Sequence, residues 1–303
     1  MTNLHTEKQT GEKTTKTPEK QTGRTATIIG IGLIGGSLAL DLKDSGFCSH
    51  ITGVEANPEH AAEAKKLGLV DEILPLKDAV KKSELVIIAV PVDATIPVLK
   101  AVLDETENQI ITDVGSTKEK IAKSVKGHPR RGRFVPSHPI WGTEFSGPSA
   151  AVRGGFSGNV TVICDKNECD PDSLAGIEAM YDAIGMKKIY MDSVSHDVHA
   201  AYVSHISHAT SFSLALSVLE KEKEVDTIFQ LAGAGFESTV RLAKSNPETW
   251  VPIFMENREN LLDVLEEQIE RLLEMKECLR HNDTKRLKSL MKKANEIKKV
   301  LKK

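Results

Sequence analysis

The sequence predicts an α/β domain with a doubly wound, mostly parallel sheet, followed by an all-α domain. Over residues 25–192, short β-branched runs alternate with amphipathic helical segments, which is the pattern of parallel strands joined by crossover helices. Over residues 193–303 apolar residues recur at helical spacing, without a strand pattern. A length of 303 residues suits two such domains. Before them, residues 1–24 contain almost no apolar side chain, so we expect a disordered tail there.

Apolar runs place the individual elements. We expect strands at 25–29, 51–55, 85–90, 109–112, 132–135, 160–164 and 187–190. Helical periodicity separates most of them and predicts helices at 34–45, 58–67, 95–103 and 171–184. In the second domain, Pro247 begins an expected long helix, with an apolar stripe of Leu261, Leu262, Leu265, Ile269, Leu272 and Leu273. The last segment, 281–303, predicts a Lys-rich amphipathic helix with a solvated face.

The composition argues against several classes of protein. The net charge is −3 and aromatic residues make up 4% of the chain, so we expect neither a basic field nor stacking platforms for nucleic acid. Apolar runs are shorter than the roughly 20 residues that a membrane span needs. The cysteines lie apart, without a CxxC pair, which favours reduced thiols in the cytoplasm over a disulfide framework or a zinc site. They are Cys48, Cys164, Cys169 and Cys278.

A glycine-rich turn follows the first expected strand and opens a helix. Such a turn lets the backbone approach a pyrophosphate closely, and the N–H groups at the start of the helix bind phosphate oxygens. Its predicted binding positions are Gly30, Gly32, Leu33, Ile34 and Gly35. Glu55 ends the second strand about 20 residues later, where a carboxylate accepts hydrogen bonds from ribose hydroxyls and repels a 2′-phosphate. The pattern predicts a Rossmann domain that binds NAD rather than NADP; the alternative is a glycine-rich turn that binds another ligand.

Three further segments follow strands at the same predicted edge of the sheet. Val90 and Pro91 end one strand, and Ser116 lies in DVGSTK after the next, where its hydroxyl either faces the cleft or caps a helix. His138 lies in a loop rich in Gly and Pro. A neutral histidine there suits a general base because its ordinary pKa is close to the working pH, although a His-Pro turn by itself is more often structural.

The helical domain contributes histidines and one arginine. His205 and His208 lie at i and i+3 and share a helix face, after His196 and His199. Buried histidine contacts with capping by Asp197, or an anion-binding histidine in the interdomain cleft, are both open at this point. A metal site is disfavoured because HExxH and an obvious third ligand are missing. Arg241 follows a glycine-rich turn; it is either a surface residue or a bidentate clamp for a carboxylate.

Taken together, five segments resemble the prephenate dehydrogenases of tyrosine biosynthesis. They are GIGLIGGS, DVGSTK, SHPIWGTEFSGP, HDVHAAYVSHISH and GAGFESTVRLAKSNPETW, and the resemblance extends over about residues 25–279. It implies NAD-dependent oxidative decarboxylation of prephenate to 4-hydroxyphenylpyruvate and carbon dioxide, with no metal. It also implies a homodimer joined through the helical domain.

The resemblance assigns roles to individual residues. His138 would accept the proton of the ring hydroxyl, and Ser116 would orient His138 and touch the nicotinamide side. The residues that would line the pocket or hold the substrate carboxylates are Thr143, Glu144, His208 and Arg241, with Trp250 packing nearby. Two positions depart from the family pattern: Trp141 is bulky where many members have a smaller residue, and Ser238 stands where many have an aspartate.

Three alternatives remain at this stage. An arogenate dehydrogenase would act on a substrate whose side chain bears an amine, which Glu144 could pair with. A β-hydroxyacid dehydrogenase would share the layout, but that class usually relies on a catalytic lysine in the helical domain. A nucleotide sensor would bind NAD without turnover and would leave the His138 loop unexplained.

Overall fold

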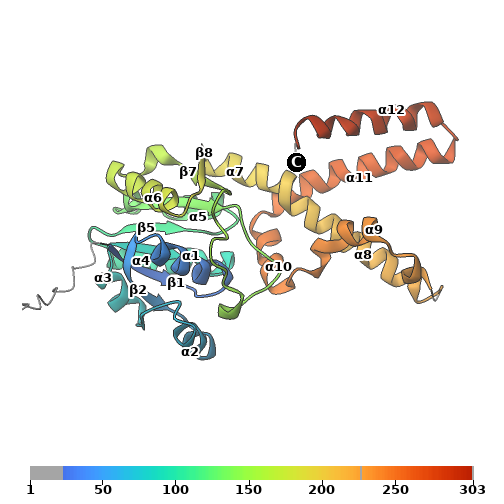
Figure 1. Cartoon of the computed structure of the whole chain (residues 1–303). Helices are drawn as coiled ribbons and strands as arrows, with labels where there is room; N and C mark the ends of the chain where they lie inside the picture. The colour runs from blue at the N-terminus through green and yellow to red at the C-terminus, as the bar shows by residue number, and fades with distance from the viewer. Residues whose placement is uncertain (1–22, 226, 302–303) are drawn as a thin grey trace, which may run out of the picture.

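The computed structural model describes residues 23–225 and 227–301. Figure 1 shows a sheet covered by helices and, beside it, a helical part that the chain enters through helix α7 (Ser193–Ala200). Most of the expected disordered tail, 1–24, lies outside the described residues. Its last residue, Arg24, instead begins the first strand of the sheet.

The sheet has the predicted mostly parallel arrangement. Among the described residues its order is β3-β2-β1-β4-β5-β6-β7-β8, and β6 and β7 form the one antiparallel pair. The strands are β1 (Arg24–Ile29), β2 (Cys48–Val54), β3 (Glu72–Ile73), β4 (Leu85–Ile88), β5 (Ile110–Asp113), β6 (Phe134–Pro139), β7 (Val160–Cys164) and β8 (Lys187–Met191). The sequence did not predict β3, which is only two residues long.

Helices pack on both faces of this sheet. They are α1 (Leu33–Asp44), α2 (Pro58–Lys66), α3 (Leu76–Lys82), α4 (Val92–Glu105), α5 (Glu119–Ser124) and α6 (Pro171–Ala183). Neighbouring residues of β1, Ile28 and Ile29, belong to two separate buried clusters. Because successive side chains of a strand point to opposite faces, both faces of the sheet are core. The sequence did not predict α3, and it indicated a helix after DVGSTK, where α5 begins, without giving its bounds.

The strand ends define the edge at which the polar segments gather. The register pairs Ile29 with Val54 and with Ile88, and Ile88 with Asp113, so these strands end at one level. The loops that follow them therefore meet at a common edge, which is where ligands bind in doubly wound sheets. Strand β6 extends past this level, and His138 lies near its end.

The helical part begins with a nearly continuous rod. Helix α7 passes through a π-helical turn, η4 (Ala201–His205), into α8 (Ile206–Glu222). π-Helical turns are rare and are found often at functional sites. The remaining helices are α9 (Ala234–Val240), α10 (Pro247–Glu256), α11 (Arg258–Arg280) and α12 (Thr284–Ala294). Short turns of 3-10 helix are η1 (Arg131–Arg133), η2 (Pro148–Ala150), η3 (Lys166–Glu168), η5 (Ile228–Leu231), η6 (Arg241–Lys244) and η7 (Asn295–Lys299).

The single long helix expected from Pro247 is wrong. Asn257 interrupts it with non-helical backbone angles and separates α10 from α11. Its buried side-chain Nδ2 donates to the carbonyl oxygen of Asp197 at 2.7 Å, a contact that lies 60 residues away in sequence. A tertiary contact has therefore overridden the local helical pattern.

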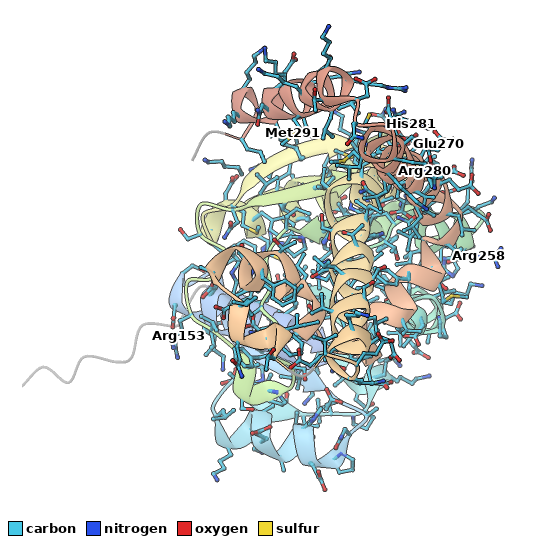
Figure 2. The ribbon with its side chains drawn as sticks, turned by 90° about the vertical axis from the view of Figure 1, so that its right-hand side faces the viewer. Arg153, Arg258, Glu270, Arg280, His281 and Met291 are labelled. Atoms are coloured by element: carbon cyan, nitrogen blue, oxygen red, sulfur yellow. The ribbon has the colours of Figure 1, made fainter. Side chains whose placement is uncertain are left out.

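The helical part leaves much of its apolar surface uncovered. Leu262, Ile269, Leu272 and Leu273 of the predicted stripe are each 46–56% exposed, whereas Leu261 is buried. Figure 2 shows Arg258, Glu270 and Arg280 of α11 and Met291 of α12 on the outside of this part. None of the described helices is long and apolar enough to cross a membrane.

Candidate active site

The glycine-rich turn forms a cradle at the end of β1. Gly30 has φ +88°, a conformation that glycine adopts at low cost, and a Cβ there would lie 2.9 Å from the backbone nitrogen of Val90. A Cβ on Gly35 would overlap the carbonyl oxygen of Gly30, so α1 packs directly on the turn. By contrast, a Cβ on Gly32 would meet nothing within 4 Å. Within the part of the chain that the structure describes, no side chain caps α1, which begins at Leu33, so the first N–H groups of this helix can bind a ligand.

Glu55 lies against the same turn. Its Oε2 accepts a hydrogen bond from the backbone nitrogen of Ile31 at 2.9 Å, and its Oε1 accepts one from Asn57 at 3.0 Å. The residue is half-buried and follows β2. Val90 is half-buried, and Pro91 is exposed at the start of α4. The structure thus brings the predicted cofactor residues together around one turn, and this cradle fits a dinucleotide.

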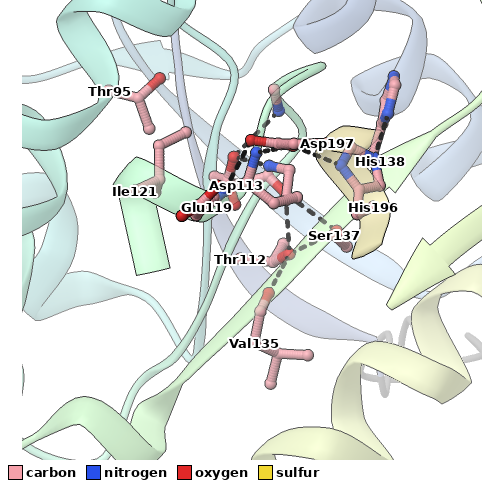
Figure 3. Close-up of polar contacts among 12 residues, drawn as sticks. Thr95, Thr112, Asp113, Glu119, Ile121, Val135, Ser137, His138, His196 and Asp197 are labelled. Carbon is pink, nitrogen blue, oxygen red and sulfur yellow. Dashed lines mark hydrogen bonds and ion pairs between the residues drawn. The ribbon is translucent and has the colours of Figure 1, made fainter. Parts of the chain in front are cut away.

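His138 takes part in a buried chain of hydrogen bonds (Figure 3). Its Nδ1 lies 2.9 Å from Nε2 of His196, and the two rings meet edge to face with centroids 5.1 Å apart. Nδ1 of His196 lies 2.7 Å from Oδ1 of Asp197. His196 and Asp197 are 3% and 2% exposed, whereas His138 is half-buried. We call these three residues the His–His–Asp triad.

Asp197 joins the helical part to the sheet. Its Oδ1 accepts a hydrogen bond from the backbone nitrogen of Lys118 at 2.7 Å, and its Oδ2 accepts one from Glu119 at 2.9 Å. These two N–H groups are at the start of α5, so a carboxylate from α7 caps a helix of the sheet domain. A helix was expected after DVGSTK with Ser116 as a possible cap, but the cap of the short α5 is Asp197, which lies 79 residues from Lys118 in sequence.

A buried ion pair lies beside this cap. The ammonium of Lys118 contacts Oδ2 of Asp113, which also accepts a hydrogen bond from the backbone of Gly115 at 3.1 Å. Both charged residues are fully buried. Burial raises the pKa of Asp113, and the nearby Lys118 opposes that rise. The segment DVGSTK is thus folded around its own ion pair.

The surroundings of His138 keep its imidazole neutral. Burial is the main cause that holds the pKa of His138 well below its usual range, and the neighbouring His196, Lys118 and His205 act in the same direction. A low pKa leaves the ring unprotonated at neutral pH, which is the form that a general base requires.

The predicted contact between Ser116 and His138 is not found. Ser116 is half-buried in the loop after β5, and within the described residues no hydrogen bond joins its side chain to His138. Nδ1 of His138 is engaged by His196 instead. Sequence reasoning considered Asp197 as a helix cap and missed its place behind His138, since 58 residues separate His138 from His196.

A second cluster lies in the helical part. His208 is 9% exposed and stacks on Trp250, with ring centroids 3.3 Å apart and planes inclined by 22°. Its Nδ1 lies 3.1 Å from the carbonyl oxygen of Ser204, so Nδ1 donates and Nε2 carries the lone pair. Burial lowers the pKa of His208; the positive charge of nearby Arg241 adds to this, while the Ser204 contact opposes it. Three predicted substrate residues are therefore brought together.

The other two predicted substrate residues, Thr143 and Glu144, lie in the loop after β6. Thr143 and Glu144 are both exposed, and the Thr143 hydroxyl accepts a hydrogen bond from the backbone of Phe145 at 3.4 Å. Among the described residues, neither forms a hydrogen bond with the helical part. The structure therefore places them in one loop with each other but does not bring them to His208.

The two departures from the family pattern have local explanations. Trp141 packs on Phe156 with ring centroids 4.7 Å apart, and it lies so close over Gly155 that a Cβ there would overlap its ring. The bulky side chain is thus accommodated by a glycine. Ser238 is exposed, and its hydroxyl donates to the carbonyl oxygen of Gly235 at 2.9 Å. No group of three or more metal-ligating side chains is found among the described residues.

Comparison with known proteins identifies the family. Residues 38–190 match the model of the prephenate dehydrogenase nucleotide-binding domain, and residues 192–293 match that of the prephenate dehydrogenase dimerization domain. The chain belongs to the prephenate dehydrogenase family. The two matched ranges meet where the sheet ends at Met191 and α7 begins at Ser193.

Individual relatives agree with this membership. The chain is 29% identical to prephenate dehydrogenase from Bacillus subtilis over 87% of its own length and 72% of that protein. It is similar to the crystal structure of prephenate dehydrogenase from A. aeolicus in complex with hydroxyphenyl propionate and NAD+, with a TM-score of 0.81 and 29% identity over 92% and 98% of the two chains. The structure of Synechocystis arogenate dehydrogenase gives a TM-score of 0.75 and 26% identity over 91% and 99%.

Proposed function

We propose that this chain catalyses the NAD-dependent oxidative decarboxylation of prephenate to 4-hydroxyphenylpyruvate and carbon dioxide. The observation that carries the proposal is the position of His138, whose Nδ1 is engaged by His196, at the same sheet edge as the glycine cradle. NAD, when bound, would supply the acceptor for the hydride of the ring carbinol carbon. Gly30, Gly32 and Gly35 would hold its pyrophosphate at the start of α1, and Glu55 would accept hydrogen bonds from its ribose.

The residues of the chain supply a base and a place for the substrate. His138 accepts the proton of the ring hydroxyl at Nε2 as the carbinol carbon becomes a carbonyl carbon. The ring carboxylate then leaves as carbon dioxide, its bonding electrons enter the ring, and the ring becomes aromatic with the oxygen as a phenolate. The phenolate takes the proton back from His138 and becomes the phenol. Because aromatisation drives the reaction, the protein needs mainly correct orientation and one good base. Ser116, in the loop after β5, would touch the nicotinamide side.

The second cluster suits the substrate carboxylates. Arg241 is exposed, and within the described residues no carboxylate pairs with its guanidinium. Its positive charge lies close enough to His208 to lower the pKa of that ring. A guanidinium beside an imidazole forms charge-assisted hydrogen bonds to a carboxylate. We assign this carboxylate to the substrate side chain, with Trp250 packing nearby. Thr143 and Glu144 are proposed to line the substrate pocket from the loop after β6.

We assign the assembly to a homodimer joined through the helical part. Its supporting observation is the exposed apolar stripe of α11, in which Ile269, Leu272 and Leu273 are at least half exposed. Contiguous exposed apolar surface of this kind marks protein interfaces. Sedimentation at several concentrations tests the assignment: Leu272→Asp should give a monomer, and a wild-type monomer would contradict it. The cytoplasmic location expected from the cysteines stays a prediction.

One assay tests the reaction and separates the main alternative. The formation of NADH is followed with prephenate and with arogenate, each with NAD and with NADP. We expect the highest kcat/KM for prephenate with NAD. A higher kcat/KM for arogenate would favour the alternative function, an arogenate dehydrogenase. If NADH forms with neither substrate, the proposal is overturned.

A further inference from the structure

We propose that His196 and Asp197 are positioning residues that fix the tautomer of His138, leaving its Nε2 unprotonated and free to act as the base. This inference rests on the proposed function, in which His138 accepts the substrate proton. It assigns a catalytic purpose to two buried residues of α7, a helix that otherwise serves as the connection between the two parts of the molecule.

The first step is the protonation state of Asp197. Its two oxygens accept hydrogen bonds from the backbone nitrogens of Lys118 and Glu119. Backbone N–H groups only donate, and two of them at a helix start favour an ionised carboxylate. The nitrogen that approaches Oδ1 at 2.7 Å, Nδ1 of His196, must then carry a proton and donate it.

The second step follows the proton order along the triad. A neutral His196 that is protonated on Nδ1 has its lone pair on Nε2. That atom lies 2.9 Å from Nδ1 of His138, so Nδ1 of His138 must be the donor in this contact. The lone pair of His138 is therefore on Nε2, the ring nitrogen that is not engaged by His196. Each bond of the triad fixes the direction of the next.

The third step concerns the charge that appears when His138 is protonated. The charged and titratable groups around the His138 ring come from three elements. They are His196 and Asp197 of α7, Asp113 and Lys118 at and after the end of β5, and His205 of η4. Lys118 is paired with Asp113, so the carboxylate of Asp197 is the negative charge left to balance an imidazolium across the ring of His196. A carboxylate behind an imidazole orients the ring and stabilises its charged form without itself taking the proton.

The location of the triad gives it a further property. His138 belongs to the sheet, whereas His196 and Asp197 belong to the first helix of the helical part. Asn257, between α10 and α11, anchors the backbone of Asp197 at 2.7 Å and contacts Nδ1 of His205 at 3.1 Å. The base is therefore in the correct tautomer only when the two parts are docked.

The test combines kinetics with a direct reading of the tautomer. In wild type, the nitrogen-15 resonances of His138, assigned by their loss in His138→Asn, should show a protonated Nδ1 and an unprotonated Nε2. In Asp197→Asn the negative charge is lost and the amide NH2 faces one of the two backbone N–H groups of α5, so the side chain no longer fixes the proton order. We expect mixed tautomers of His138 and a fall in kcat on the order of 10²–10⁴, with KM for prephenate and Kd for NAD changed less than about threefold.

Two further variants keep the test decisive. Asp192→Asn is the matched control. Asp192 caps the same helix, since its Oδ1 accepts a hydrogen bond from the backbone nitrogen of Ser195 at 2.8 Å, and it is not part of the triad. The tautomer of His138 and the kcat of this variant should equal those of wild type. If Asp197→Asn does not fold, His196→Phe retains the α5 cap and should give mixed His138 tautomers with the same loss of kcat. His196→Gln, whose amide oxygen accepts from Nδ1, should recover about tenfold over His196→Phe.

Separate outcomes judge the inference and the proposed function. A wild-type His138 protonated on Nε2, or a His196→Phe variant with wild-type kcat, would overturn the positioning role. The spectra need no substrate, so an enzyme that shows the expected tautomer yet does not oxidise prephenate would overturn the proposed function alone.

Discussion

The sheet edge and the helical part contribute to the site in different physical ways. At the sheet edge these ionisable groups are buried or half-buried and already partnered: Asp113 with Lys118, and His138 with His196. In the helical part, Arg241 is exposed and has no carboxylate partner among the described residues. Under the proposed roles, the base is prepared before substrate arrives, whereas the substrate would complete the carboxylate site at Arg241. Changes at the sheet edge should therefore alter kcat, and changes at Arg241 should alter KM.

The largest effect is expected where the base itself is removed. His138→Asn keeps a polar side chain of similar reach but cannot accept the proton, so kcat should fall by roughly 10²–10⁴. The Kd for NAD, measured by fluorescence titration, should stay near the wild-type value because the glycine cradle is untouched. A mutant with undiminished kcat would remove His138 from the mechanism.

The buried His205 should make stability depend on pH. Burial lowers its pKa to about 4, against the opposing effect of Asp197. The unfolded chain, with an ordinary histidine pKa, binds more protons between these values, so stability is full at neutral pH and declines as the pH falls toward 4. The free energy of unfolding, measured with urea, falls between pH 7 and about pH 4.5. This fall should be about 2–3 kcal/mol smaller in His205→Gln than in wild type. The exposed His281→Asn is the control; parallel pH dependence in His205→Gln and wild type would contradict the prediction.

Removal of the guanidinium tests the other half of the comparison. Arg241→Ala loses a charge-assisted hydrogen bond worth about 1.5–3 kcal/mol, so KM for prephenate should rise roughly ten- to a hundredfold. The effect falls mainly on KM because the bound substrate already makes the contact. Lys244→Ala, on the same turn and paired with Glu237, is the matched control. Equal losses in both variants would show a nonspecific charge effect rather than a clamp.

Cofactor preference should show the smallest change. Glu55 contacts the glycine-rich turn, and Glu55→Ser removes both its negative charge and its hydrogen-bond acceptors for the ribose. The ratio of kcat/KM for NAD to that for NADP should fall by about tenfold, which corresponds to one lost charged hydrogen bond. Steady-state kinetics with both cofactors measures this ratio. An unchanged ratio would show that Glu55 does not determine the cofactor preference.

The sequence predicted those features that depend on local patterns. Buried parallel strands are continuous apolar runs, and the glycine-rich turn requires particular residues at fixed spacing, so both could be recognised. The helix break at Asn257 and the cap of α5 depend on Asp197, which is distant from both in sequence. The His–His–Asp triad was missed for the same reason: its contacts exist only once the two parts have docked. Ser116 was predicted behind His138 because the sequence shows which loops meet but not which side chains bond.

The stoichiometry of the products tests the central proposal most directly. Wild-type protein is incubated with prephenate and NAD, and NADH and carbon dioxide are measured in the same sample. The account predicts that the two are formed in equal amounts, with 4-hydroxyphenylpyruvate as the organic product. NADH without carbon dioxide would point to a simple hydroxyacid dehydrogenase, and binding of NAD with neither product would point to a sensor; either result would contradict the account.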